Sequence, residues 1–418
     1  MHSVMFIPFI RKECPYMNLN TAPSLSQIES LEACLGTLEE LYPEMVETRR
    51  HFHRHPELSH QEIETPKQIE QFYKELGMEV RSGVGGRGVV AKLTLPGTAK
   101  TIAFRADFDA LPIQDEKNVP YCSTVPGIMH ACGHDGHTSA LMALAKSLFV
   151  NKEKVPCNVV FIHQFGEEEY PGGAMAMIED GCLDGVDAIY GCHLQSTMPS
   201  GVMFYREGFI QAAVDTFSVT VCGKGGHGAV PHETVDPIVV SSQIVSAFQT
   251  IVSRNTDPLQ QLVVSVGSIH SGEAPNVIPT EAVMTGTIRS YDPSVRKLAS
   301  ERLTKIAEGV AEAMNASAEV RIETGYDALW NHPEETRIAK AAMIQIFGEE
   351  HVQETPPVMP GEDFSYYTQK VPGSFIFAGA QLKNEHDVYP HHHARFDFDE
   401  TAMLNTAKTF ASIVFQYK

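Results

Sequence analysis

The sequence predicts an α/β fold in which helices cover a mostly parallel sheet, with a smaller α+β domain inserted into it. The first observation is length, because 418 residues exceed one ordinary hydrophobic core and favour two domains. The second is that apolar strand-like runs alternate with helical patterns up to about residue 212 and again after about residue 329, which is typical of a helix-covered parallel sheet. The third is a different order of elements over residues 213–328.

In the first part of the chain, the predicted strands are short apolar runs between turns. Helical patterns over residues 28–77 precede two strands around a Gly-rich turn in MEVRSGVGGRGVVAKLTLPG. A buried strand in KTIAFRADFDALP ends in carboxylates, and residues 139–150 suit a buried helix because they are apolar on nearly all sides. The strand at 158–165, the helix in GGAMAMIEDG and the strand in VDAIYGCHL follow.

The pattern changes near residue 213. The alternating strand in DTFSVTVCGKGGHG is followed by a long amphipathic helix, for which Asp236 is the expected N-cap and Pro237 the first-turn residue. Two strands, QLVVSVGSIHSG and EAVMTGTIRSYD, a second helix in SVRKLASERLTKIAEGVAEAMN and a strand in AEVRIETGY complete the segment. Strand–helix–strand–strand–helix–strand is the order of a ferredoxin-like module. The predicted divisions are an N-terminal extension (1–27), a larger domain in two parts (28–212 and 329–418) and an inserted domain (213–328).

Composition and charge exclude several classes of partner. The chain has 32 Lys and Arg against 52 Asp and Glu, and its net charge of −20 repels nucleic acids and anionic membranes. No apolar run approaches the roughly 20 residues of a membrane-spanning helix. The eight cysteines are spread unevenly along the chain, which indicates reduced thiols and a cytoplasmic protein rather than a disulfide framework. Neither nucleic acid nor a membrane is therefore expected as a partner.

The stretch MHACGHDGH, residues 129–137, has the residue types of a metal site. Cys132 and His134 are two positions apart, so in an extended segment their side chains point the same way. A thiolate and an imidazole are good ligands for zinc or a similar divalent ion, and the start of the predicted helix that follows favours a thiolate. Taken alone, the stretch fits a buried cysteine among hydrogen-bonded histidines about as well as a metal site.

Four further clusters favour the metal site: Asp107 and Asp109 in FRADFDALP, the glutamates of HQFGEEEYPGG, His193 in GCHLQ, and the histidines of YPHHHARFDF. Each cluster alone fits a surface acid run, a core histidine or a solvated loop. All of them fall at predicted strand ends, where the active sites of open α/β sheets gather. A metal ion with a nearby carboxylate is the usual equipment for amide hydrolysis, because the ion lowers the pKa of water and the carboxylate transfers its proton.

A series of motifs runs in order from about residue 38 to the C-terminus: RxxxHxxPELSxxE, RADFDALPIQDE, MHACGHDGHT, the double glutamate, GKGGHGAVPH, APNVIPTEA…GTIRSYD, GEDFSYY and HHARFDFDE. The series resembles the M20 metallopeptidases, and within them the amidohydrolases that include hippurate hydrolase, N-acyl-amino-acid amidohydrolases and auxin-conjugate hydrolases. The resemblance implies a hydrolase that splits N-acyl amino acids into a carboxylic acid and a free amino acid. It also implies two divalent metal ions per subunit, zinc or manganese with cobalt or nickel as alternatives.

The resemblance further assigns roles to residues and domains. Residues 28–212 and 329–418 become a catalytic domain, residues 213–328 become a lid or dimerisation domain, and the chain is expected to form a homodimer or a higher homo-oligomer. Glu167 matches the general base, Asp109 the aspartate that orients a metal-bound group, and His227 a histidine that steadies the oxyanion, across a dimer in several members. Asn276 and Arg289 match substrate-binding positions. The metal ligands are Cys132, which is expected between the two ions, His134, Glu168, His193 and His392.

Two positions and two alternative functions stay open. The third glutamate of QFGEEE allows the pair to be Glu168–Glu169, although the distance to GGA favours residues 167 and 168. His391 stands where the family usually has a hydrophobic residue, so the ligand is His391 or His392. A dipeptidase or aminopeptidase on the same scaffold would need acidic groups to hold an α-ammonium. A metal-binding protein without catalysis is disfavoured by the presence of Glu167 and of every expected ligand type.

Overall fold

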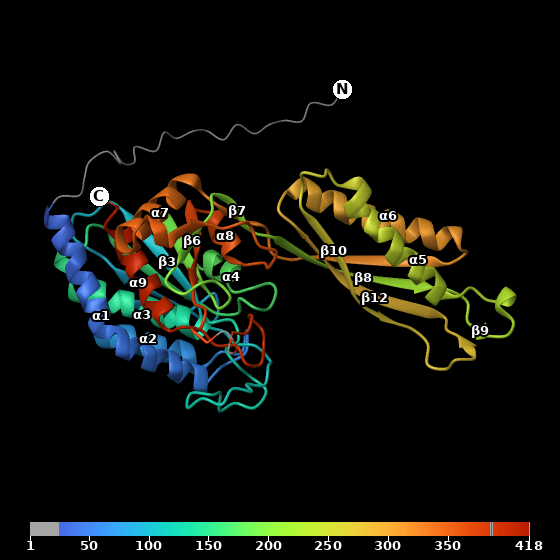
Figure 1. Cartoon of the computed structure of the whole chain (residues 1–418), viewed down its shortest axis with the longest axis horizontal. Coiled ribbons are helices and arrows are strands. Elements are labelled where there is room, and N and C mark those ends of the chain that lie inside the picture. The colour runs from blue at the N-terminus through green and yellow to red at the C-terminus, as the bar shows by residue number, and fades with distance from the viewer. Residues whose placement is uncertain (1–24, 385, 387, 418) are drawn as a thin grey trace, which may run out of the picture.

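The computed structural model describes residues 25–384, 386 and 388–417 and has a mixed α/β architecture. Figure 1 shows a larger domain built on a central sheet and a smaller domain that extends from it. The N-terminal extension expected over residues 1–27 lies almost entirely outside the described residues, since the first helix, α1, begins at Leu25. None of the described helices is both long and apolar enough to cross a membrane.

The sheet of the larger domain has eight strands in the order β1-β2-β4-β3-β5-β16-β6-β15. Its centre is parallel, because β3 pairs in parallel with β4 and β5, and β5 pairs in parallel with β16. This mostly parallel centre confirms the predicted fold class. The strands are β1 (Glu79–Val84), β2 (Gly88–Leu93), β3 (Thr101–Asp107), β4 (Asn158–Gln164), β5 (Ala188–Gln195), β6 (Met203–Tyr205), β15 (Val352–Glu354) and β16 (Gly373–Gly379).

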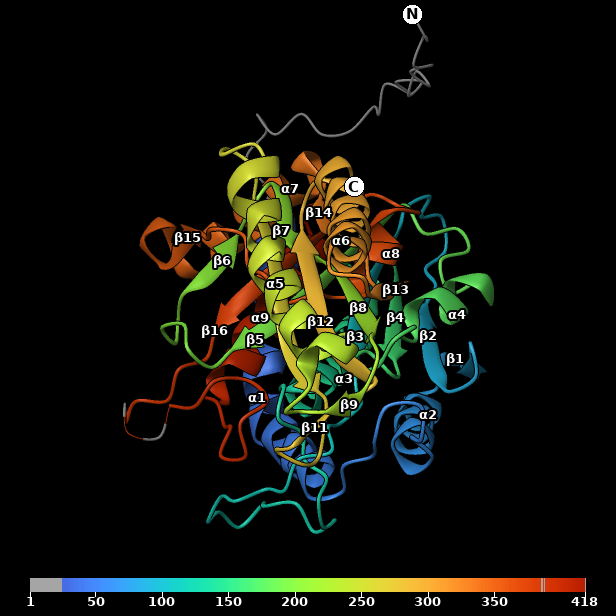
Figure 2. The same ribbon diagram turned by 90° about the vertical axis from the view of Figure 1, so that its right-hand side faces the viewer.

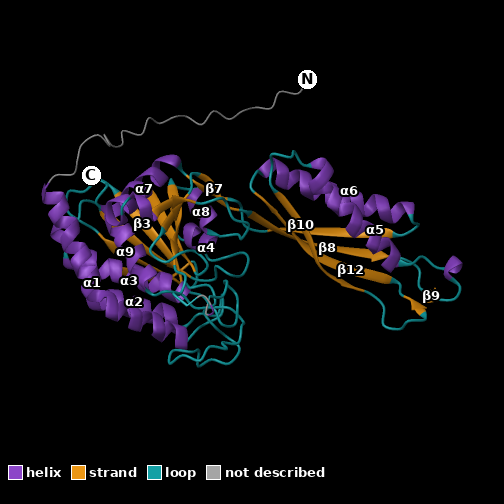
Figure 3. Ribbon diagram, viewed as in Figure 1, coloured by secondary structure: helices purple, strands orange, loops and turns teal. Residues whose placement is uncertain are grey.

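Helices cover both faces of this sheet (Figure 3). On one side of β5 the hydroxyls of Tyr190 and Tyr417 form a hydrogen bond, and Tyr417 directly follows α9 in the sequence. On the other side a Cβ at Gly191 would meet Phe364 of α8, so glycine lets that helix approach closely. The helices are α1 (Leu25–Arg54), α2 (Glu64–Leu76), α3 (His134–Val150), α4 (Ala174–Glu179), α7 (Pro333–Phe347), α8 (Phe364–Thr368) and α9 (Thr401–Val414), with single turns η1 (Lys152–Lys154) and η4 (Glu349–His351).

Helix α3 corrects one sequence expectation. The helix predicted over residues 139–150 begins five residues earlier, at His134. Its first turns carry polar side chains that are buried and paired inside the protein, such as His137 with Asp107 and Thr138 with His163. An apolar pattern therefore could not reveal this part of the helix.

The smaller domain is the predicted ferredoxin-like module. Its antiparallel sheet has the order β10-β12-β8-β13, and Asp236 caps α5 as expected by accepting hydrogen bonds from the backbone N–H groups of Ile238 and Val239. Figure 2 views the molecule from this domain's side. The elements are β8 (Ala213–Cys222), α5 (Pro237–Thr250), the π-helical turn η3 (Ile251–Asn255), β10 (Leu262–His270), β12 (Glu281–Ser290), α6 (Pro293–Ala313) and β13 (Ser317–Thr324).

One face of the smaller sheet carries α5 and α6, and no helix of the described part of the domain covers the other face. Phe217, Ile288 and Ile322 point toward the helices, where they join a separate hydrophobic core. Because side chains alternate along a strand, their neighbours Thr216, Arg289 and Glu323 lie on the helix-free face. Short strand pairs complete the chain: β7 (Gly208–Gln211) with β14 (Leu329–Asn331), and β9 (Gly226–His227) with β11 (Val277–Ile278), the latter next to η2 (Pro231–Glu233).

Candidate active site

The candidate residues gather at the carboxyl ends of β3, β4 and β5, as expected for an open α/β sheet. They face a cavity of about 910 Å³ that is lined by side chains of both domains. Glu167 and His193 line it from the larger domain, and Arg289 lines it from the smaller one. Both domains therefore border the space in which a substrate would meet the candidate ligands.

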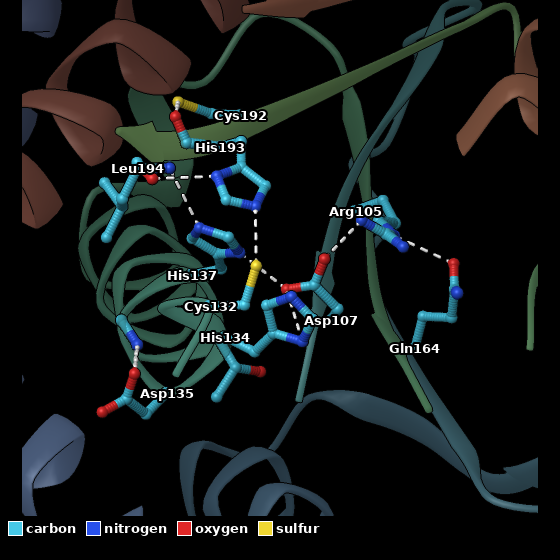
Figure 4. Close-up of polar contacts among 12 residues, drawn as sticks. Arg105, Asp107, Cys132, His134, Asp135, His137, Gln164, Cys192, His193 and Leu194 are labelled. Atoms are coloured by element: carbon cyan, nitrogen blue, oxygen red, sulfur yellow. Dashed lines mark hydrogen bonds and ion pairs between the residues drawn. The ribbon is translucent and has the colours of Figure 1, made fainter. Parts of the chain in front are cut away.

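Cys132 and His193 form the first part of the ligand cluster. The Sγ atom of Cys132 lies 3.4 Å from Nε2 of His193 (Figure 4). Nδ1–H of the same ring donates to the carbonyl oxygen of Leu194 at 2.8 Å, which leaves the Nε2 lone pair facing the sulfur. A backbone partner on the far nitrogen is the usual way in which a metal-binding histidine is oriented.

His134 is oriented by a carboxylate instead. Its Nδ1 lies 3.0 Å from Oδ1 of Asp109, and its Nε2 points toward Oε1 of Glu168 at 3.7 Å. The other oxygen of Asp109 accepts from the hydroxyl of Ser59 at 2.7 Å and from the backbone N–H of Glu168 at 3.0 Å. One aspartate thus positions both His134 and the segment that carries the glutamates.

The C-terminal histidines separate into two roles. Nε2 of His392 lies 3.3 Å from Oε1 of Glu168, whereas Nε2–H of His391 donates to the carbonyl oxygen of Leu194 at 2.9 Å. His392 has a φ of 63°, a left-handed conformation that non-glycine residues seldom adopt. This geometry favours His392 as the ligand, because its Nε2 faces Glu168 and lies in the same donor group as Cys132.

The chemistry of these donors fits metal ions. Nε2 of His134 and Oε1 of Glu168 are both buried, and neither has a hydrogen-bond partner among the described residues. Two groups of donor atoms contain Cys132, and within each group the atoms lie within 4.8 Å of one another. One group adds His134 and His193, and the other adds Glu168 and His392. A divalent cation held by these donors would give Nε2 of His134 and Oε1 of Glu168 the partner that each lacks.

The charges of the cluster point the same way. Burial opposes a charge on His134, but the carboxylates of Asp107 and Asp109 outweigh it and raise its pKa to about 10. Burial, with Glu168 and Glu167 nearby, raises the pKa of the Cys132 thiol well above its ordinary value. The protein therefore concentrates negative charge where only protons or cations can balance it.

Glu167 lies beside the ligand cluster and belongs to a second group of acids. Carboxylate oxygens of Glu167, Glu362 and Asp363 come within 4.8 Å of one another. The buried guanidinium of Arg105 holds this group, at 3.0 Å from Glu362 and 2.8 Å from Asp363. Burial raises the pKa of Glu167 well above its ordinary value, and the charges of Glu362 and Glu168 raise it further.

The third glutamate of the run is placed elsewhere. The side chain of Glu169 is exposed and forms no hydrogen bond with the described residues. Its backbone carbonyl accepts from Nε2–H of His60 at 3.0 Å and from the N–H of Gly172 at 2.9 Å. Glu167 and Glu168 both line the cavity. The arrangement supports the 167–168 register over the alternative pair.

His137, the third histidine of the opening motif, has both ring nitrogens occupied. Nδ1–H donates to Asp107 at 2.6 Å, and Nε2 accepts from the backbone N–H of Leu194 at 3.0 Å (Figure 4). Asp107 also pairs with Arg105 at 2.6 Å. His137 therefore links α3 to the ends of β3 and β5 without a free nitrogen for a metal ion.

The segment PELSHQE, residues 56–62, holds Asp109 and the loop that carries the glutamates. The sequence did not reveal this role. Ser59 donates to Asp109, and Oε1 of Glu62 accepts the backbone N–H of Gly166 at 2.9 Å. The ring of His60 packs so closely over Gly166 that a Cβ there would lie 2.7 Å from it, and Gly166 has a φ of 65°. The signal was the RxxxHxxPELSxxE motif, which carried no assigned role.

The residues expected from the smaller domain are divided. Arg289 lines the cavity, and no hydrogen bond or ion pair joins its guanidinium to the described residues. His227 and Asn276 lie together near the small β9–β11 pair, where the N–H of Gly228 donates to the carbonyl oxygen of Asn276 at 2.9 Å. Both are exposed, and neither lines the cavity of this chain.

Comparisons with known proteins identify the family to which this chain belongs. Residues 103–416 match the peptidase family M20/M25/M40. The chain is 48% identical over 380 residues to amidohydrolase YhaA of Bacillus subtilis (strain 168), covering 91% of this chain and 96% of that protein. It is 35% identical over 384 residues to hippurate hydrolase of Campylobacter jejuni subsp. jejuni, covering 90% and 97% of the two chains.

A solved structure supports the same assignment. The YXEP protein of Bacillus subtilis, described as a dinuclear metal-binding peptidase of the M20 family, superimposes with a TM-score of 0.77 at 33% identity. The match covers 90% of this chain and 98% of that one. The chain is thus a member of the peptidase family M20/M25/M40 and a hydrolase that acts on amide bonds.

Proposed function

We propose that this protein hydrolyses the amide bond of N-acyl amino acids and releases a carboxylic acid and a free amino acid. The observation that carries the proposal is a cavity that holds both the buried donor cluster around Cys132 and the guanidinium of Arg289, which is unpaired among the described residues. An N-acyl amino acid offers a carbonyl to the first and a free α-carboxylate to the second. The similarity to hippurate hydrolase supports this substrate class.

The residues proposed to hold two divalent ions are Cys132, His134, Glu168, His193 and His392. When bound, such ions lower the pKa of water and polarise a carbonyl group. The thiolate favours zinc, while carboxylate and imidazole ligands also admit manganese, cobalt or nickel. Asp109 fixes the orientation of His134, and the carbonyl of Leu194 fixes that of His193.

Glu167 is proposed as the general base. Its carboxylate lines the cavity directly beside Glu168, and the hydroxyl of Tyr326 holds its backbone by donating to the carbonyl oxygen at 2.7 Å. It takes a proton from the attacking water, holds it, and passes it to the nitrogen of the leaving amine. Arg105 forms ion pairs with Glu362 and Asp363, the two acids next to Glu167, and so holds them in position.

The cavity also suits the two ends of such a substrate. Arg289 can grip a carboxylate with two parallel hydrogen bonds. Apolar surface for the acyl group comes from Tyr170, Val214, Val358 and Met359, which line the same space. The lining side chains therefore offer a cationic contact and apolar surface.

We further propose that the chain works as a homodimer formed through residues 213–328, while residues 28–212 and 329–418 hold the metal ligands. Helix α5 contains no Lys, Arg, Asp or Glu, and its Ile238 and Val239 are 47% and 48% exposed. The neighbouring edge strand β10, LVVSVGSIH, also lacks these residues, so its unpaired edge is open to a second chain. In such a dimer the exposed His227 and Asn276 would serve the partner subunit's cavity.

The compartment is proposed from the thiols. The seven cysteines in the described part of the chain are all free, including the exposed Cys222. Free thiols in this number fit the reducing environment of the cytoplasm.

The function is tested with the metal-loaded protein on N-benzoylglycine, N-acetyl amino acids and free dipeptides. Turnover of the first two classes supports the proposal, whereas turnover of free dipeptides alone would favour the dipeptidase.

Arg289→Ala should lower kcat/KM for N-benzoylglycine about 10- to 150-fold, the scale of a lost charge-assisted contact, and spare the neutral amide analogue. Arg321→Ala is the matched control, because Arg321 lies on β13, pairs with Glu319 and is outside the cavity. Equal losses on acid and amide would show that Arg289 does not read the carboxylate.

A further inference from the structure

Glu323 is a cavity-lining acid that the proposed reaction does not use. It lies on β13, and among the described residues its carboxylate has only a long contact, 3.5 Å from the hydroxyl of Thr216. No ion pair joins it to a described cation, in contrast to Glu319 on the same strand, which pairs with Arg321 at 2.8 Å. The cavity thus presents a free negative charge as well as the free positive charge of Arg289.

The two charges lie on the same face of the smaller sheet, on opposite sides of β8. Arg289 is the register partner of Val214, and Glu323 is the register partner of Thr216. Neighbouring strands lie about 4.8 Å apart, and a strand rises about 3.3 Å per residue. Arg289 and Glu323 are separated by two strand spacings and by two residues along the strand, so their Cα atoms lie roughly 12 Å apart. Two inward-pointing side chains and a small zwitterionic ligand can fill that distance.

We propose that Glu323 selects N-acyl amino acids whose side chain carries a positive charge, such as lysine, ornithine or arginine. The inference rests on the proposed function, because Arg289 is taken to hold the α-carboxylate. An extended basic side chain then leads from that carboxylate along the helix-free face toward Glu323. The strongly acidic character of the protein, with its net charge of −20, favours a cationic ligand in addition.

The test compares N-benzoyl-L-lysine with N-benzoyl-L-norleucine, which differ only by the terminal ammonium. We expect the wild-type protein to prefer the lysine compound about 2- to 5-fold in kcat/KM, the scale of a partly solvated ion pair. Glu323→Gln should remove this preference, and Glu323→Lys should reverse it. Added salt should weaken the preference. Glu319→Gln is the matched control, since it removes an acid from the same strand and face outside the cavity.

Either of two results with Glu323→Gln would overturn the proposal. One is a lysine-to-norleucine ratio that is the same in the wild-type protein and in Glu323→Gln. The other is a loss in Glu323→Gln that is greater for glycyl-L-norleucine than for N-acetylglycyl-L-norleucine, because Glu323 would then bind an ammonium on the acyl side. If both benzoyl compounds are hydrolysed equally, only this inference fails. If neither is hydrolysed by the metal-loaded protein, the proposed function fails with it.

Discussion

The candidate residues of the larger domain are held by hydrogen bonds within the chain, whereas those of the smaller domain are exposed or lack a described partner. In the larger domain the candidate ligands are mostly buried and individually oriented, as His134 is by Asp109 and His193 is by Leu194. In the smaller domain Arg289 has no described partner, and His227 and Asn276 are exposed at its far end. The candidate ligands are held within the chain, whereas the candidate residues of the smaller domain are open to a substrate or, in the proposed dimer, to a second subunit.

This difference follows from burial. A buried polar group left unpaired is costly, so the chain must hold the ligand side chains in one arrangement through their hydrogen bonds. An exposed side chain such as His227 is hydrated without a partner and is free to be recruited. The metal-binding half should therefore survive changes in the smaller domain, whereas substrate recognition should depend on both domains.

The largest expected effect is in the larger domain. Glu167→Gln should keep metal and substrate binding but lower kcat at least about 100-fold, because a general base is lost. Glu168→Gln should instead lose metal, as measured by elemental analysis. Glu169→Gln, with an exposed side chain, is the matched control. If Glu168→Gln keeps its metal and Glu167→Gln loses it, the two roles are exchanged.

The next effect tests the smaller domain. If His227 serves the partner subunit's cavity, Glu167→Gln and His227→Ala should each be inactive as separate proteins and regain activity when mixed. Each mixed dimer would then contain one cavity with an intact Glu167 and an intact His227. The measurement is activity after demonstrated subunit exchange. Absence of recovery would place His227 in its own subunit's site or outside the site.

The smallest effect concerns the support beneath the glutamates. Glu62→Ala removes the acceptor of the buried Gly166 N–H and should lower the free energy of unfolding by about 1–3 kcal/mol, the cost of an unpaired buried donor. Burial, with the charge of Asp109, raises the pKa of Glu62 to about 8, so its carboxyl is largely protonated near neutral pH. Glu62→Gln should therefore retain most of the stability in denaturant titrations. Equal losses in the two variants would show that this hydrogen bond does not support the loop.

The sequence was informative where chemistry is concentrated in short stretches. Cys132 and His134 lie in one motif, and the expected gathering of strand-end residues follows from the parallel sheet. The sequence could not decide between adjacent residues with the same side chain, because the backbone conformation determines where each side chain points. His391 turns to a carbonyl while His392, in a left-handed conformation, meets Glu168.

Contacts between distant segments were also beyond the sequence. Glu62 accepts a hydrogen bond from Gly166, more than a hundred residues away, and Ser59 donates to Asp109, 50 residues away. No periodicity or spacing encodes such a pairing. The place of His227 was likewise not predictable, because it depends on how far the smaller domain extends from the larger one (Figure 1).

The most direct measurement is the metal content of Cys132→Ala. Cys132 belongs to both donor sets, so its removal should weaken both sites at once. The reconstituted wild-type protein should contain about two divalent ions per chain, as in a dinuclear centre. Cys132→Ala should contain clearly less metal and lose most of its activity, with an unchanged circular dichroism spectrum. A folded variant with the wild-type metal content would contradict the dinuclear centre proposed around Cys132.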